Sequence, residues 1–230
     1  FLKALGAVPI PISRAALGGI FLERCGIECR YGSVGDEHDA VKLLEGCDIV
    51  VDFAHPIGLS SKVQSAVRSN ITNIVKYAPA GVPYIFISTI SAFGMPNDSA
   101  KMKNYFFSRT MYSADKRRLE SFALKQKRNR DVYVLRLGQV HGELQTVSEE
   151  FKEEVKVDDL RLPFPEDTKS YSVFCYSIAE AVMNIYQKKE TPGKYTLISS
   201  PAWNWSELYQ YWADRGDENL KLTFEDIERR

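Results

Sequence analysis

The sequence predicts an α/β protein built around a doubly wound parallel sheet. Apolar runs alternate with amphipathic segments up to Gly138, and several of these runs are apolar throughout, as strands buried on both faces require. Buried strands that alternate with helices indicate parallel strand–helix–strand units. A chain of 230 residues is long enough for one such domain with a small second lobe.

Each expected element follows from a local pattern. The predicted strands cover residues 7–13, 27–34, 47–55, 83–89, 131–138 and 194–200. The predicted helices cover residues 36–46, 59–78, 110–129, 176–188 and 203–216. The first helix has an acidic first turn and ends at Gly46, and the second carries apolar residues three and four positions apart.

After Gly142 the sequence becomes acidic and contains prolines, which indicates a small lobe that is partly interleaved with the first domain. We expect a dinucleotide-binding domain at 1–142, to which 171–200 returns. The small substrate-binding lobe is then formed by 143–170 and 201–230.

Composition excludes several classes of function. Thirty basic and thirty acidic residues cancel, so the charge predicts neither a nucleic-acid partner nor an anionic membrane surface. No apolar run is long enough for a membrane span, and no signal peptide is recognised. Four scattered cysteines predict free thiols in the cytoplasm, with neither a disulfide framework nor a metal site.

The chemistry-bearing pattern is a strand that ends in hydroxyls, followed by a tyrosine four residues before a lysine. Thr89 and Ser91 lie at the end of the "YIFIST" strand, where ligands bind in a doubly wound sheet. Tyr112 and Lys116 are one helical turn apart, so an ammonium lies beside a phenol. A nearby cation lowers the pKa of a phenol and makes it a better acid–base group. The spacing alone is more typical of a solvated helix face.

The order of neighbouring passages resembles the extended short-chain dehydrogenase/reductases, in the branch of epimerases and dehydratases that act on nucleotide sugars. The matching passages are "YGSVGDEHDAVKLLEGCDIVVDFAH", "RSNITNIVKYA", "FISTISAFG", "YSADK" and "LRLGQVHG". The resemblance covers about residues 1–200 and implies a Rossmann-type fold, an NAD(P) cofactor, a nucleotide-sugar substrate and a homodimer.

The resemblance also implies roles for single residues. The catalytic residues would be Thr89 as a substrate-binding hydroxyl, Tyr112 as the acid–base group and Lys116 as its electrostatic partner. The residues expected at the cofactor are Ser13, Arg14, Asp36, Ala54, His55, Asn70, Ser88, Tyr112 and Lys116.

The sequence departs from the family at several positions. None of its 14 glycines forms the family's Gly-x-x-Gly-x-x-Gly loop, so we expect the first strand and this loop to be missing from the sequence. His141 replaces the usual aromatic residue, Leu137 a common proline and Ser177 an aspartate.

The end of the strand at 7–13 carries Ser13 and Arg14 and no acid, and an arginine there accommodates the 2′-phosphate of NADP. We therefore expect NADP(H) as the cofactor, with NAD(H) as the alternative.

Three functions fit this pattern. The first is an NAD(P)-dependent epimerase or dehydratase of a nucleotide-activated sugar that works by transient hydride transfer. The second is an NADPH-dependent carbonyl reductase on the same scaffold, and the third is a cofactor-binding member without catalytic activity. The apolar spacing of the helices at 59–78 and 110–124 also predicts a two-fold homodimer through these helices.

Overall fold

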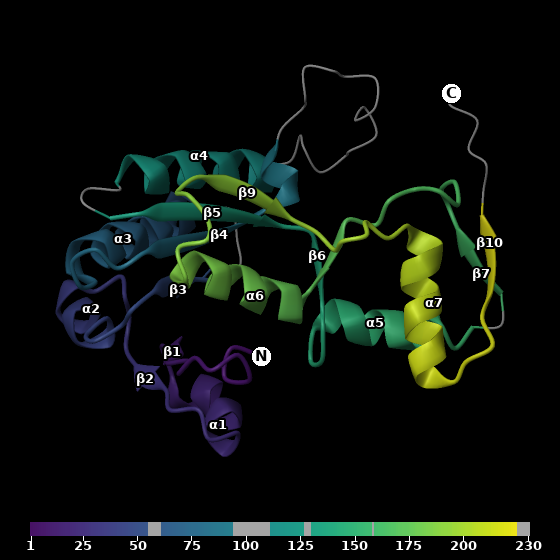
Figure 1. Ribbon diagram of the computed structural model, residues 1–230, viewed down its shortest axis with the longest axis horizontal. Coiled ribbons are helices and arrows are strands. Elements are labelled where there is room, and N and C mark those ends of the chain that lie inside the picture. Colours follow the sequence, from purple (N-terminus) through teal and green to yellow (C-terminus); the bar gives the residue numbers. More distant parts are fainter. Residues whose placement is uncertain (55–60, 94–110, 127–129, 158, 225–230) are drawn as a thin grey trace. The chain divides into compact units, whose positions relative to one another are not determined.

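The computed structural model describes residues 1–54, 61–93, 111–126, 130–157 and 159–224 (Figure 1). The chain divides into two compact units. The first unit contains residues 1–136 and 179–196, and the second contains residues 137–178 and 197–230.

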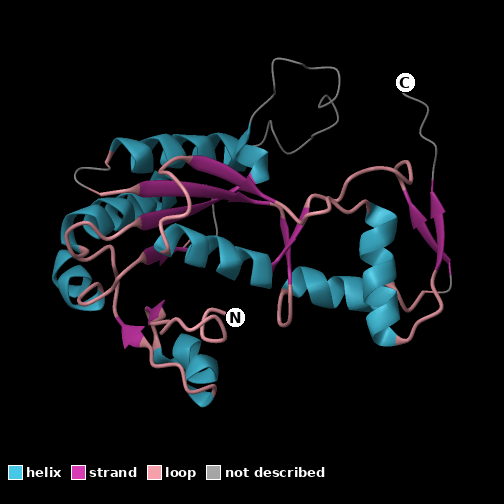
Figure 2. Ribbon diagram, viewed as in Figure 1, coloured by secondary structure: helices cyan, strands magenta, loops and turns pink. Residues whose placement is uncertain are grey.

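The secondary structure alternates between strands and helices along most of the chain (Figure 2). The strands are β1 (Ile12–Ser13), β2 (Arg30–Tyr31), β3 (Val50–Asp52), β4 (Tyr84–Thr89), β5 (Val132–Leu137), β6 (Gln139–His141), β7 (Asp159–Leu162), β8 (Ser172–Phe174), β9 (Lys194–Leu197) and β10 (Lys221–Phe224). The helices are α1 (Ala16–Arg24), α2 (Glu37–Leu43), α3 (Ser61–Tyr77), α4 (Met111–Lys125), α5 (Thr146–Glu154), α6 (Cys175–Tyr186) and α7 (Trp205–Gly216), with a short 3₁₀ helix η1 (Ile90–Phe93) after β4.

The first unit is organised around a sheet with the strand order β3–β4–β5–β9. Strands β3 and β4 pair in parallel, with Val50 opposite Tyr84 and Asp52 opposite Phe86. Helices α4 and α6 lie on opposite sides of this sheet (Figure 1). Buried apolar residues of α2, α3 and α4 pack against β3, β4 and β5 in one core. The predicted α/β architecture with parallel strands is therefore confirmed.

A second, shorter sheet in the first unit consists of β1 and β2, which pair in parallel. Within the described residues, β1 pairs with β2 alone and β3 pairs with β4 alone. Large apolar side chains are exposed on and beside these strands, among them Leu17, Phe21 and Phe53.

The first strands are shorter than the sequence predicts. Pro9 and Pro11 have no amide N–H to donate to a neighbouring strand, so pairing begins only at Ile12. Helix α1 was not predicted, because its two adjacent glycines lower helix propensity. A Cβ atom at Gly19 would meet the hydroxyl end of the Tyr31 side chain, which would have to move aside.

The second unit contains two parallel strand pairs, β6 with β8 and β7 with β10, together with α5 and α7. Helix α7 begins at a capping box, in which Asn204 accepts from the Glu207 amide and the Glu207 carboxylate accepts from the Asn204 amide. Its buried face, with Leu208 and Trp212, packs on Phe151 of α5. This aromatic-rich core belongs to the second unit itself.

His141 is fully buried inside this aromatic core. Its ring lies 5.0 Å from the Phe151 ring, 5.8 Å from the Phe174 ring and 6.0 Å from the Trp212 ring, measured between centroids. Its Nε2 atom lies 3.2 Å from the Gln139 Oε1 atom, and its Nδ1 atom is buried with no partner among the described residues. Burial among these rings lowers the pKa of His141 from 6.5 to about 4.

This burial predicts an acid-sensitive second unit. Between pH 6.5 and about 4 the unfolded chain protonates His141 while the folded protein does not. The free energy of unfolding should therefore fall by about 1.4 kcal/mol for each unit by which the pH decreases within this window. Above pH 6.5, His141 should contribute little to the pH dependence of stability. Urea titrations between pH 4 and 8 would measure this slope.

The variant His141→Phe should remove most of the slope, because phenylalanine fills the aromatic site without a titratable group. His38 is exposed on α2, so His38→Gln serves as the matched control and should keep the wild-type profile. An unchanged slope in His141→Phe would contradict the assignment to His141.

Candidate functional site

The predicted tyrosine–lysine pair lies on the face of α4 that packs against β4. Tyr112, Lys116 and Glu120 follow each other at four-residue intervals and so share this face. Lys116 is only 4% exposed, and its Nζ atom donates to the carbonyl oxygen of Ile87 at 3.3 Å. The same ammonium lies 5.4 Å from the centre of the Phe86 ring. Helix α4 therefore places a buried positive charge near the carboxyl end of β4.

The pKa of the Tyr112 phenol differs from the prediction. Half-buried Tyr112 has its pKa raised by burial, whereas the four-residue spacing predicted that the lysine would lower it. The Lys116 ammonium lies 6.0 Å from the centre of the Tyr112 ring while it donates to the Ile87 carbonyl. At this distance the desolvation of the phenol dominates.

The hydroxyl cluster at the end of β4 has two different roles. The Ser88 hydroxyl is buried and donates to the Glu120 carboxylate at 2.7 Å. The Thr89 Oγ1 atom lies 3.2 Å from the Ser91 Oγ atom and accepts from the Ser91 amide at 3.3 Å. Ser88 therefore anchors the helix, and the Thr89 hydroxyl lies at the end of the strand.

Glu120 is the centre of a buried charge network that the sequence did not predict. The Arg136 guanidinium donates to both of its carboxylate oxygens, from Nε at 2.9 Å and from Nη2 at 2.7 Å. Lys194 of β9 lies 3.3 Å from the same carboxylate. Burial alone would raise the pKa of Glu120, but the hydrogen bonds from Arg136 and Ser88 and the two positive charges lower it. The network fixes α4 to three strands.

Asp52 is a second buried carboxylate that sequence reasoning missed. It ends β3, is 6% exposed, and accepts from the Tyr84 hydroxyl and from the Ala54 amide, both at 3.0 Å. Burial raises its pKa, while these two hydrogen bonds and the charge of Lys116 act in the opposite direction. The available signal was an acid inside the apolar run "DIVVDFA".

The residues expected at the cofactor lie at several places in the first unit. Ser13 ends β1, and its hydroxyl donates to the Ala15 carbonyl at 2.8 Å, while Arg14 is exposed directly after it. Ala54 is exposed just beyond β3. These residues lie at or just beyond the carboxyl ends of their strands, which is where ligands bind in this architecture. His55 lies outside the described residues.

Two other expected cofactor residues have clear local roles. Asp36 is the N-cap of α2, where its Oδ1 atom accepts from the amides of His38 and Asp39. Asn70 is half-buried, and its Oδ1 atom lies 2.9 Å from the position that a Cβ atom on Gly35 would occupy. The asparagine that joins α3 to the segment between β2 and α2 is instead Asn73, which is buried and donates to the Val34 carbonyl at 2.9 Å. The sequence reasoning did not single out Asn73.

The described residues fit a dinucleotide in part. The exposed Arg14 guanidinium is a phosphate-binding group, and the Lys116 ammonium with the Thr89 hydroxyl offers donors at the end of β4. The glycine-rich cradle for a pyrophosphate is not present in the sequence. Within the described parts of the chain, no cluster of three His, Cys, Asp or Glu residues is arranged to hold a metal ion. No helix among the described residues is long and apolar enough to cross a membrane.

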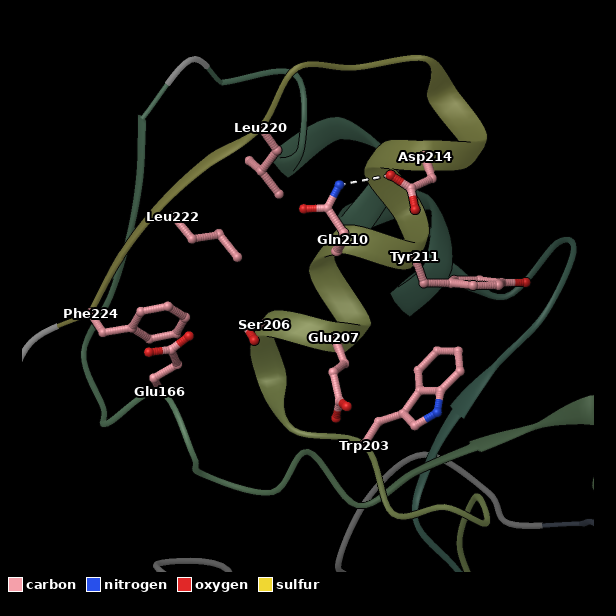
Figure 3. A pocket seen from close by; sticks show the side chains of 10 residues that line it. All are labelled: Glu166, Trp203, Ser206, Glu207, Gln210, Tyr211, Asp214, Leu220, Leu222 and Phe224. Atoms are coloured by element: carbon pink, nitrogen blue, oxygen red, sulfur yellow. Dashed lines mark hydrogen bonds between the residues drawn. The ribbon is translucent and has the colours of Figure 1, made fainter.

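The second unit carries a separate pocket of about 680 Å³ beside α7 (Figure 3). Leu220, Leu222 and Phe224 form one side of this pocket, and polar side chains of α7 face them. The Gln210 amide donates to the Asp214 carboxylate at 2.7 Å within α7. The pocket is large enough for a small molecule, and no motif of the sequence predicted it.

The fold is similar to that of several solved enzymes. Neither a protein-family model nor a curated protein sequence matches the chain. The UDP-N-acetylglucosamine 4-epimerase from Bacillus cereus has a TM-score of 0.72 at 16% identity, over 97% of this chain and 78% of that one. The UDP-glucose 4-epimerase from Thermus thermophilus, in complex with NAD, has a TM-score of 0.67 at 18% identity, over 96% and 79%.

RMD from Pseudomonas aeruginosa, complexed with NADPH, has a TM-score of 0.64 at 14% identity, over 96% of this chain and 87% of that one. At these identities the likeness establishes the fold, and it agrees with the motifs that the sequence carries. The chain therefore has a Rossmann-type fold, which it shares with these enzymes.

Proposed function

We propose that this protein is an NAD(P)-dependent epimerase or dehydratase that acts on a nucleotide-activated sugar by transient hydride transfer. The proposed catalytic residues are Thr89, Tyr112 and Lys116. The observation that carries the proposal is the buried Lys116 ammonium, which α4 holds against the end of β4 one turn after Tyr112. Structural likeness to two sugar-nucleotide epimerases supports the choice of substrate class.

The catalytic residues have complementary tasks in this proposal. A bound nicotinamide cofactor supplies the hydride acceptor and donor. The Thr89 hydroxyl binds the reacting sugar oxygen, and the Tyr112 hydroxyl exchanges a proton with it. The Lys116 ammonium stabilises the negative charge that develops on the Tyr112 oxygen. Because the pKa of Tyr112 is raised by burial, this stabilisation is needed for the proton transfer.

The cofactor would be held by residues at the strand ends. We propose that Ser13 and Arg14 bind the adenosine ribose and its 2′-phosphate, which favours NADP(H) over NAD(H). The further residues of this proposed surface are Asp36, Ala54, His55 and Asn70. Ser88 was also expected there, but its buried hydroxyl is bound to Glu120. The likeness to one structure with NAD and one with NADPH supports a nicotinamide cofactor of either kind.

The proposal includes a homodimer in the cytoplasm, with contacts through α3 and α4. The family resemblance is its main support, because the apolar side chains of α3 are already buried in the core of the first unit. Val67, Ile71, Ile74 and Val75 are all buried in its core. The exposed surface of α3 instead offers Ala66 and Arg68, and the Arg68 guanidinium lies 4.8 Å from the centre of the Phe122 ring of α4.

Substitution of Tyr112 tests the catalytic assignment. Tyr112→Phe should lower kcat by about 10²- to 10⁴-fold with cofactor binding nearly intact, because only the proton-transferring oxygen is lost. Sugar-nucleotide turnover and cofactor titration would measure the two effects. More than about a tenth of wild-type kcat in this variant would contradict the assignment.

Net hydride transfer from NADPH to an added carbonyl, seen as a loss of nicotinamide absorbance, would identify a reductase instead. Tight cofactor binding without turnover of any sugar nucleotide would identify a non-catalytic member.

Arg14 tests the cofactor preference. Its guanidinium forms charge-assisted hydrogen bonds to a phosphate, so Arg14→Ala should narrow the preference for NADP(H) over NAD(H) by about tenfold or more. Competitive titration of the two cofactors would measure the ratio of affinities. Arg24, exposed at the end of α1, provides the control variant Arg24→Ala, which should keep the wild-type ratio. A wild-type preference for NAD(H) would show that Arg14 has another role.

Sedimentation tests the homodimer. The intact protein should sediment as a dimer at micromolar concentration, and Ala66→Glu on α3 should shift it toward the monomer by placing a charge in the contact. Gln210→Glu on α7 is the matched control, since it adds the same charge to the second unit. A wild-type monomer, or equal dimerisation of both variants, would count against contacts through α3.

A further inference from the structure

The charge of Lys116 requires an explanation, because its ammonium is almost entirely buried. Its Nζ atom donates to the Ile87 carbonyl and lies over the Phe86 ring, and both of these groups are neutral. A buried ammonium loses its hydration and tends to release its proton unless an opposite charge lies nearby. Burial indeed lowers the pKa of Lys116.

Asp52 lies opposite Phe86 in the β3–β4 pairing, and the Lys116 ammonium lies 5.4 Å from the centre of the Phe86 ring, so the carboxylate and the ammonium lie on the same face of these strands. A second buried carboxylate, Glu120, follows Lys116 by one turn on α4. Both carboxylates raise the pKa of Lys116 against the effect of burial. They differ in what already neutralises them. The Glu120 carboxylate is bound by the Arg136 guanidinium and lies 3.3 Å from the Lys194 ammonium, so its charge is compensated. The hydrogen-bond donors to Asp52 are the Tyr84 hydroxyl and the Ala54 amide, which carry no net charge.

We propose that Asp52 is the counter-charge that keeps the buried Lys116 protonated, and is thereby a positioning residue for the Tyr112–Lys116 pair. Strand β3 supplies this carboxylate, and α4 supplies the ammonium. The two hydrogen bonds to Asp52 fix its orientation without removing its charge. The link to catalysis rests on the proposed function, whereas the charge coupling does not.

The coupling is reciprocal. Burial raises the pKa of Asp52, and the charge of Lys116 opposes this increase. The titratable and charged groups around the pair are Tyr84 on β4, Tyr112 and Glu120 on α4, Arg136 on β5 and Lys194 on β9. Of these groups, Glu120, Arg136 and Lys194 form their own network. If the Asp52 charge is lost, no other group in the site should therefore supply a negative charge to Lys116.

The variant Asp52→Asn tests this inference because it keeps the shape of the side chain and removes its charge. The Lys116 titration midpoint should fall by about one pH unit or more, a tenfold change in its protonation equilibrium. The cofactor-free protein with ¹³C-labelled lysine side chains would be titrated by NMR, and the Lys116 signal assigned by its absence in Lys116→Met. Tyr84→Phe is the matched control, because it removes a neutral donor and leaves the carboxylate.

In Tyr84→Phe the Lys116 midpoint should stay within about 0.3 pH unit of wild type, a change about twofold or smaller in the equilibrium. Equal midpoints in wild type and Asp52→Asn, or an equal fall in both variants, would overturn the proposal.

A folding defect in Asp52→Asn would also be informative. If the defect arises from an unpaired Lys116 charge, the double variant Asp52→Asn/Lys116→Met should fold, since neither buried charge remains. Failure of the double variant, when Lys116→Met alone folds, would overturn the proposal.

The midpoint is measured without cofactor or substrate, so the inference and the proposed function can fail separately. Activity retained in Tyr112→Phe together with a shifted Lys116 midpoint would reject the function and keep the charge coupling.

Discussion

The buried ion pair between Glu120 and Arg136 is the interaction on which the candidate site depends. It joins α4 to β5, and the same carboxylate also binds Ser88 of β4 and lies beside Lys194 of β9. One side chain thus fixes the helix against three neighbouring strands. Loss of a single partner from a buried pair leaves an uncompensated charge and costs about 3–5 kcal/mol, so the position of α4 is strongly determined.

This anchor decides where the chemistry-bearing groups of α4 lie. Glu120 is one turn after Lys116 and two turns after Tyr112, so fixing Glu120 fixes the orientation of the whole face. The Lys116 ammonium is then held at the Ile87 carbonyl and over the Phe86 ring, away from bulk water. A charge that is expensive to bury is retained here, and such charges are typical of functional sites.

The first unit also leaves part of its apolar surface uncovered. Residues of α1 and the end of β3 expose large apolar side chains beside two sheets that do not pair with one another within the described residues. The second unit buries its own aromatic core around His141, and its assignment as the substrate-binding lobe stays a prediction.

The sequence predicted the architecture because its signals are local. Apolar runs such as "YIFIST" and "VYVLRL", the spacing of α3 and the order of the family-like passages do not depend on distant contacts. Helix α1 and the short strands of the second unit were missed or shortened, because their local propensities are weak and pairing with remote segments stabilises them. Pro9 and Pro11 likewise limited a strand whose length the apolar pattern overstated.

For the site, the sequence by itself determined that Tyr112, Lys116 and Glu120 share one helix face and that hydroxyls end β4. Only the tertiary structure decided that Ser88 donates to Glu120, and that Asn73 rather than Asn70 joins α3 to the Val34 carbonyl. It also decided that Asp52 is buried opposite Phe86, whose ring lies under the Lys116 ammonium. The reason is that helix spacing is a property of consecutive residues. Burial and charge pairing arise between residues that are distant in the sequence, such as Asp52 and Lys116, and only the folded chain brings them together.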